Sequence, residues 1–213
     1  MLIGIFDSGI GGEAMATKLR ELLPDAEIVS IDDHEHVPYG SRPETEIIDL
    51  TVAAIQPLLA MKCNAIVIAC NTATTVAIRT LRERYPTVLF IGIEPMIKPA
   101  AHITHTGHIA VCATPGTLHS ARYKELKDTW AKGVEVIEPD CSLWASAIEK
   151  QQSYSLDIES TVRSLKQQEV DVIVLGCTHY HWIKQQIADV AGPNISVLEP
   201  TDAIARRITS LIS

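Results

Sequence analysis

Two segments of the chain each end an apolar run with a cysteine and a small polar residue. They read Ala-Ile-Val-Ile-Ala-Cys70-Asn-Thr72 and Val-Ile-Val-Leu-Gly-Cys177-Thr-His179, and they lie about half the chain apart. Two related halves, each presenting a cysteine at the carboxyl end of a strand, would explain the repeat. Because cysteine is also a common small buried residue, two such matches can arise by chance.

Two cysteines that face one carbon atom would suit proton transfer. A thiolate is a good base when helix N-terminal dipoles or polar neighbours stabilise it. One charged and one neutral thiol on opposite sides of a stereocentre can remove a proton and return another. A nucleophilic Cys–His pair would need only one cysteine. The repeat therefore favours a racemase or epimerase that works without a cofactor.

Two further turns follow apolar runs. The run at 2–6 leads into Asp7-Ser8-Gly9-Ile10-Gly11-Gly12, and the run at 109–112 leads into Ala113-Thr114-Pro115-Gly116-Thr117. Glycines allow close approach of a ligand to the backbone, and the amides of a helix start attract anions. The glycine spacing matches neither a dinucleotide fingerprint nor a P-loop. The second turn could hold a carboxylate, although each turn taken alone is more often a plain helix cap.

Strand-like and helix-like patterns alternate along the whole chain. Eight short runs are apolar or rich in β-branched residues, and the stretches between them have apolar residues spaced three and four apart, as in helices. The runs are Leu2–Phe6, Glu27–Ile31, Ala65–Ala69, Val88–Ile91, Ile109–Cys112, Val134–Ile137, Val170–Leu175 and Ile195–Leu198. Helical crossovers force parallel pairing of such buried strands. The pattern predicts an α/β protein with two similar, open, mostly parallel sheets flanked by helices. We expect them to be pseudo-symmetric, with the site in the cleft between them.

Composition and charge exclude several classes of protein. The 213 residues are 46% hydrophobic, too many for a disordered chain, and carry 18 Lys+Arg against 26 Asp+Glu, a net charge of −8. This acidic balance argues against nucleic acid as a partner. No apolar run approaches the roughly 20 residues that cross a bilayer, and the opening MLIGIF has no basic flank typical of a signal peptide. We therefore expect a cytoplasmic protein that has no membrane partner.

The cysteines and histidines do not predict a metal site. The five cysteines form no CxxC pair and their number is odd, so free thiols are expected rather than disulfides or structural zinc. His34-Glu35-His36 and the series His102, His105, His108 lie in polar, loop-like stretches. Structural zinc needs ligands that converge from fixed spacings. We expect no metal.

Five motifs in a fixed order carry a family resemblance. They are Phe-Asp7-Ser8-Gly-Ile-Gly-Gly12, Val-Pro38-Tyr39-Gly40, Ala-Cys70-Asn71-Thr72-Ala, Ala113-Thr114-x-x-Thr117 and Gly176-Cys177-Thr178-His179-Tyr180. From about residue 3 to residue 198, the chain resembles the bacterial glutamate racemases of the aspartate/glutamate racemase superfamily. His181-Trp182 stands where proline commonly follows the last motif in that family.

The resemblance implies racemisation of glutamate without a cofactor, supplying D-glutamate for peptidoglycan. It implies that Cys70 and Cys177 are the two acid/base residues, that Asp7 assists Cys70, and that His179, oriented by Glu149, assists Cys177. It also implies a set of substrate-binding residues: Asp7, Ser8, Pro38, Tyr39, Gly40, Asn71, Thr72, Thr114, Thr117, Thr178 and His179.

The resemblance also implies the organisation of the chain. The first α/β domain would comprise residues 1–96 and 199–213, and the second residues 97–198, in a protein that forms a homodimer. The partner would be a small acidic amino acid. Two alternatives stay open: a racemase for aspartate or another acidic amino acid, and a shortened non-catalytic homologue that binds an acidic metabolite or a protein.

Overall fold

The computed structural model describes residues 1–212, which form two compact units. Unit 1 comprises Met1–Glu94 and the segment from Pro200 onward, and unit 2 comprises Pro95–Glu199. The chain therefore passes from one unit to the other twice, each time at a Glu-Pro sequence.

Each unit contains a four-stranded sheet in which every described pair of neighbouring strands is parallel. The first has the order β2-β1-β3-β4 and the second the order β6-β5-β7-β8. The strands are β1 (Leu2–Asp7), β2 (Glu27–Asp32), β3 (Ala65–Ile68), β4 (Phe90–Gly92), β5 (His108–Ala113), β6 (Glu135–Ile137), β7 (Val172–Gly176) and β8 (Ser196–Leu198). The two orders are the same once β1 is matched to β5, β2 to β6, and so on. The prediction of two similar, parallel, open sheets is confirmed.

The helices of each unit lie on its own sheet. Unit 1 has α1 (Gly11–Leu22), α2 (Glu44–Ala54), α3 (Gln56–Ala60), α4 (Asn71–Arg84) and α11 (Thr201–Ile212), with 3-10 turns η1 (His34–His36) and η2 (Tyr39–Ser41). Unit 2 has α5 (Ile97–Ile103), α6 (Pro115–His119), α7 (Ala121–Trp130), α8 (Trp144–Glu149), α9 (Ile158–Gln167) and α10 (Lys184–Ala191), with 3-10 turns η3 (Ser153–Ser155) and η4 (Thr178–Ile183).

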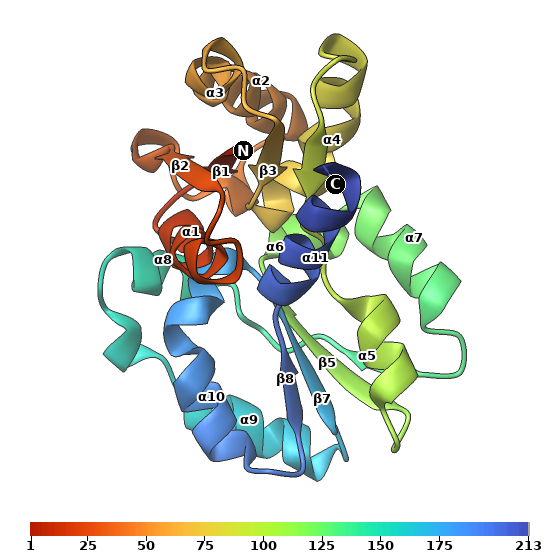
Figure 1. Ribbon diagram of the computed structural model, residues 1–213. Coiled ribbons are helices and arrows are strands. Elements are labelled where there is room, and N and C mark those ends of the chain that lie inside the picture. The colour runs from red at the N-terminus through yellow and green to blue at the C-terminus, as the bar shows by residue number, and fades with distance from the viewer. Residues whose placement is uncertain (213) are drawn as a thin grey trace. The chain divides into compact units, whose positions relative to one another are not determined.

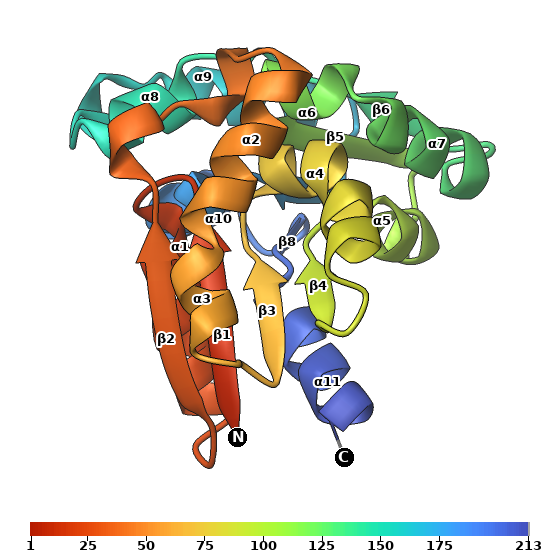
Figure 2. The same ribbon diagram turned by 90° about the horizontal axis from the view of Figure 1, so that it is seen from above.

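Strand alternation divides the core of unit 1 between the two faces of its sheet. Ile3 and Ile5 of β1 pack in one cluster with Met15 of α1 and Ile208 of α11. Residues of opposite parity, such as Phe6, pack in another cluster with side chains of α2, α3 and α4. Because successive side chains of a strand point to opposite faces, both faces are apolar and the strand reads as a continuous apolar run. Figure 2 shows α2 and α3 in front of the strands of this sheet.

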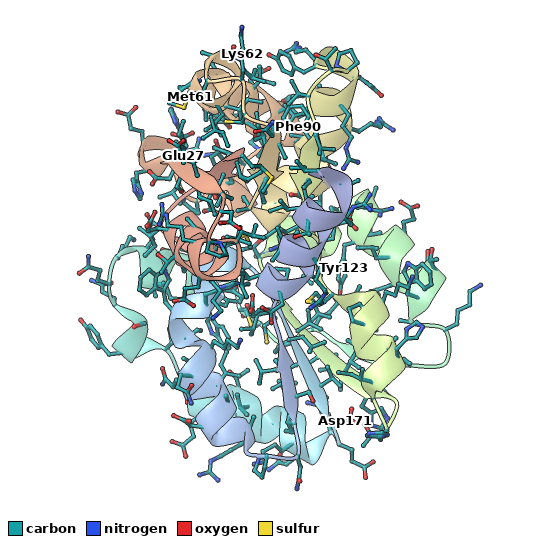
Figure 3. The ribbon with its side chains drawn as sticks, viewed as in Figure 1. Glu27, Met61, Lys62, Phe90, Tyr123 and Asp171 are labelled. Carbon is teal, nitrogen blue, oxygen red and sulfur yellow. The ribbon has the colours of Figure 1, made fainter. Side chains whose placement is uncertain are left out.

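Unit 2 has the same layering. Ile109 of β5 and Val172 of β7 pack with Ile97 of α5 and Tyr123 of α7. In Figure 1, α5 lies on one side of β5, β7 and β8, and α9 and α10 lie on the other. At the amino end of this sheet, Asp171 accepts hydrogen bonds from the Thr104 hydroxyl at 2.5 Å and from a backbone N–H at 2.6 Å (Figure 3). The opposite, carboxyl end is where the motif residues lie.

Two strands, β4 and β7, begin two residues later than their apolar runs predict. The N–H of Val88 donates to the carbonyl of Tyr85 at 3.0 Å, and that of Val170 donates to Leu165 at 3.1 Å. These residues still belong to the turns that end α4 and α9, so their N–H groups are not available to the sheet. Apolar character alone does not distinguish the last turn residue from the first strand residue.

Candidate functional site: two matching half-sites

The first half-site is built on the turns that follow β1 and β3. These strands are neighbours, and in an open α/β sheet ligands bind at the carboxyl ends where the strand order reverses. Asp7 ends β1 with no exposed surface, and its Oδ1 accepts the Gly9 N–H at 2.8 Å. A Cβ atom at Gly12 would lie 2.5 Å from that of Asp7, so only glycine lets α1 start this close to the carboxylate.

Cys70 lies at the N-terminus of α4. Its Sγ accepts the backbone N–H of Ala73 at 3.3 Å, and the Ser8 hydroxyl donates to the same sulfur at 3.2 Å. A helix N-terminus and hydrogen-bond donors both stabilise negative charge on sulfur. Only 6% of Cys70 is exposed, so few solvent contacts compete with these donors. The structure therefore brings Ser8 and Cys70 together from separate turns.

Asn71, the first residue of α4, has an unusual environment. It is 3% exposed, and neither its Oδ1 nor its Nδ2 has a hydrogen-bond partner among residues 1–212. An unmet buried amide costs about 1–3 kcal/mol, and native proteins rarely keep one without a reason. The next residue, Thr72, is equally buried. A polar ligand at this helix start would satisfy the amide.

The turn containing Pro38, Tyr39 and Gly40 is fixed by a carboxylate that our sequence analysis did not single out. Asp33 accepts the Tyr39 hydroxyl at 2.7 Å and approaches Nδ1 of His36 at 2.7 Å. Burial, and then the neighbouring Asp33, raise the pKa of Tyr39 far above its usual value. The hydroxyl of Tyr39 is thus engaged within unit 1. The position of Asp33 directly after β2 was the available signal.

The second half-site is built on the matching turns of unit 2. Cys177 follows β7 as Cys70 follows β3, and it is 8% exposed. Its Sγ lies 3.7 Å from Nδ1 of His179, and Nε2 of His179 lies 2.5 Å from Oε2 of Glu149. The side chains of His179 and Glu149 are 4% and 14% exposed. When Nε2 carries the proton shared with Glu149, the lone pair of Nδ1 faces the sulfur.

Aromatic packing holds Glu149 in place. It is the last residue of α8, and Trp144 at the start of that helix packs edge-on against Tyr180 with ring centroids 5.3 Å apart. The Tyr180 hydroxyl donates to the carbonyl of Cys141 at 3.1 Å. These contacts fix α8 against η4, which carries His179. The alignment of carboxylate, imidazole and thiol is therefore a product of packing.

The turn after β5 presents two hydroxyl groups. Thr114 caps α6 by accepting the N–H of Thr117, and the two Oγ1 atoms lie 3.2 Å apart. Thr114 is 9% exposed, whereas Thr117 has no exposed surface. Thr178, beside Cys177, is also buried. The predicted residues of unit 2 therefore gather at the carboxyl end of its own sheet, as those of unit 1 do.

Within residues 1–212, no three or more His, Cys, Asp or Glu side chains are grouped so that they could hold a metal ion. No helix in the same range is long and apolar enough to cross a membrane.

Comparison with known proteins identifies the family. Residues 11–208 match the model of the Asp/Glu/hydantoin racemase family. The chain belongs to this family. The resemblance is confirmed, and so is the prediction of an enzyme: the chain is an isomerase of the amino-acid racemase type, similar to glutamate racemases.

Several racemases in this family are similar to the chain over nearly its full length. Glutamate racemase of Ectopseudomonas mendocina is 37% identical over 215 residues, covering 99% of this chain and 81% of the relative. The Escherichia coli enzyme, solved with L-glutamate and the activator UDP-MurNAc-Ala, is 30% identical with a TM-score of 0.87, covering 99% and 82%. The Francisella tularensis enzyme, solved with D-glutamate, is 27% identical with a TM-score of 0.81, covering 99% and 80%. An aspartate racemase of Picrophilus torridus is 17% identical with a TM-score of 0.67, covering 99% of this chain and 94% of that one, and it shares the fold of this chain.

Proposed function

We propose that the chain interconverts L- and D-glutamate by two-base proton transfer between Cys70 and Cys177. The observation that carries the proposal is their equivalence: each follows the third strand of its unit, in sheets of identical order. Each thiol also has polar groups beside it, the Ser8 hydroxyl in unit 1 and the His179 imidazole in unit 2. One thiolate removes the α-proton, and the opposite thiol donates its own proton to the other face of the carbanion.

The remaining residues divide into proton carriers and binding groups. Asp7 would exchange protons with Cys70, and His179, held by Glu149, would do so with Cys177. The substrate would contact the turn at Pro38, Tyr39 and Gly40 and the polar residues near each cysteine, which are Ser8, Asn71, Thr72, Thr114, Thr117 and Thr178. The mechanism needs a group from each half-site to reach the same substrate molecule, and it requires no cofactor.

Glutamate is the favoured substrate because relatives that are 30%, 36% and 37% identical to the chain are named glutamate racemases. A role in supplying D-glutamate for peptidoglycan goes with that substrate. A homodimer, a cytoplasmic location and the predicted domain boundaries stay predictions from the sequence.

Racemisation in D₂O tests the proposal directly. Incubation with L-glutamate should give D-glutamate that carries deuterium at Cα from the first turnover, because the returning proton comes from a solvent-exchanged thiol. NMR and loss of optical rotation measure this, with L-aspartate tested in parallel. Turnover of aspartate but not glutamate would favour the alternative substrate. Binding without α-deuteration of either amino acid would indicate the non-catalytic homologue and contradict the proposal.

Replacing Asn71 by leucine should weaken substrate binding without lowering the stability of the fold. Leucine is similar in size, and it removes a buried amide that lacks partners, so the free energy of unfolding should stay the same or rise by up to about 1–3 kcal/mol. If Asn71 binds substrate, KM for glutamate should rise about tenfold, the equivalent of roughly 1.4 kcal/mol. Steady-state kinetics and urea unfolding measure the two effects.

Ser30 of β2 supplies the matched control, because its Oγ is also buried without a hydrogen-bond partner. Ser30→Ala should show the same direction of stability change with no change in KM. A KM for Asn71→Leu equal to that of the unmodified chain would remove Asn71 from the binding groups.

A further inference from the structure

One charged cluster of unit 2 has no part in the proposed mechanism. Glu199 follows β8, and its side chain is 11% exposed. Its Oε1 lies 3.6 Å from Nζ of Lys184, and its Oε2 lies 3.5 Å from Nε2 of His181. A carboxylate this deeply buried needs charged or polar neighbours, and here both come from the segment that carries the second half-site.

The two contacts differ in kind. Burial lowers the pKa of His181, and this outweighs the effect of Glu199, which raises it. His181 is therefore neutral at neutral pH, and its Nε2 has no hydrogen-bond partner among the described residues. Lys184, by contrast, supplies a positive charge to Glu199. At 3.6 Å the contact between Lys184 and Glu199 is longer than an ordinary hydrogen bond, so it acts mainly through electrostatic attraction, whereas the His181 ring packs beside the carboxylate as a neutral group.

The cluster lies beside the residues proposed for catalysis. His179 and His181 both belong to η4, and Lys184 begins α10 directly after it. Strand β8 pairs with β7, with Leu198 opposite Val174, so Glu199 continues β8 along the strand that ends just before Cys177. Glu199 therefore contacts both His181 within η4 and Lys184 at the start of α10, directly after η4.

We propose that Glu199 is a positioning residue for the Cys177 half-site, which holds η4 through Lys184 and His181 and so sets the placement of His179. The inference rests on the proposed two-base function. Glu199 acts from outside the reacting groups, and its effect is confined to one of the two bases. Displacement of a catalytic group by about 1 Å can cost roughly a hundredfold in rate, whereas an ion pair with a partly exposed lysine contributes little to stability.

Racemisation rates cannot reveal a one-sided effect. Two free enantiomers have equal energy, so any change lowers kcat/KM equally in both directions. Elimination of HCl from 3-chloroglutamate avoids this limit because it needs only one base. A thiolate takes the α-proton, the C–Cl bond breaks with loss of chloride, and the resulting enamine hydrolyses to 2-oxoglutarate and ammonium. The variants Cys70→Ala and Cys177→Ala show which enantiomer each cysteine deprotonates.

The decisive variants are Glu199→Gln and Lys184→Met. Each should lower elimination from the enantiomer deprotonated by Cys177 by about tenfold to a hundredfold, and should leave elimination from the other enantiomer unchanged. Lys184→Arg, which keeps the positive charge, should retain most of the activity. Asp189→Asn is the matched control, because it removes one negative charge from an exposed position on α10, and it should change neither rate.

The possible outcomes separate the two proposals. Equal losses with both enantiomers, or no loss with either, would overturn the positioning role of Glu199 while leaving the two-base function in place. If the unmodified chain eliminates chloride from neither enantiomer, the proposed function fails and the inference fails with it. If circular dichroism shows that Glu199→Gln does not fold, Lys184→Met decides, because its side chain is 42% exposed and its replacement disturbs packing less.

Discussion

Cys70→Ala and Cys177→Ala are each expected to reduce racemisation of glutamate by about 10²- to 10⁴-fold, the range typical of a lost general acid or base. Each thiol is needed in both directions, as base for one enantiomer and as acid for the other. A one-base mechanism would predict a large loss for one variant only. Racemisation is measured by circular dichroism of glutamate at both enantiomeric starting points.

Each of these two variants should still catalyse elimination, but from one enantiomer only, and the enantiomer should differ between the two. The variant that lacks Cys70 still has Cys177 beside His179, and the variant that lacks Cys177 still has Cys70 beside Ser8. Each should therefore eliminate chloride from one enantiomer of 3-chloroglutamate and not from the other. Cys63→Ala is the control, because Cys63 lies outside both half-sites and is a free cysteine like the others. If either single variant racemises glutamate at the rate of the unmodified chain, the two-base mechanism is contradicted.

Glu149→Ala is the change expected to cost both stability and activity. Nε2 of His179 lies 2.5 Å from Oε2 of Glu149, and the His179 side chain is almost completely buried. Removing the carboxylate therefore takes this hydrogen-bond acceptor away from a buried imidazole N–H. Breaking such a pair costs about 3–5 kcal/mol of unfolding free energy. Loss of the fixed imidazole position should also lower racemisation by about tenfold to a hundredfold. Urea unfolding and steady-state kinetics measure the two losses.

Two further variants separate orientation from charge. Glu149→Gln keeps an acceptor oxygen for His179, so it should recover most of the stability while racemisation stays reduced if the carboxylate charge matters. Glu138→Ala is the control: this carboxylate accepts the hydroxyl of buried Tyr123 at 2.9 Å, far along the chain from the cysteine motifs. It should lower stability without changing racemisation. Normal activity in Glu149→Ala would exclude Glu149 from the proton-transfer chain.

The sequence alone predicts most of the fold because the signals for its elements are local. Parallel strands covered on both faces must be apolar throughout, and this makes β1, β3, β5 and β7 visible as runs. The repeat around Cys70 and Cys177 likewise predicts that both cysteines follow equivalent strands, and the sheet orders agree with it. Strand ends are less visible, as Val88 and Val170 illustrate, because a turn residue can be as apolar as a strand residue.

The contacts around each cysteine were decided by tertiary structure. Ser8 donates to Cys70 from 62 positions away, and His179 contacts Glu149 across 30 positions. Such pairs depend on which turns the sheets bring together and on how α8 packs against η4, and no spacing along the chain encodes either. The carboxylate of Glu199 was missed for this reason.

The amino-acid sequence by itself determined which residue types end which strands, and therefore which residues could take part in chemistry. Periodicity and capping act over a few residues, so a linear reading captures them. Only the tertiary structure decided that the Asn71 amide is buried without a partner and that Lys184 approaches Glu199. Burial and electrostatic pairing depend on all the groups packed around an atom, and most of those groups are distant in the chain.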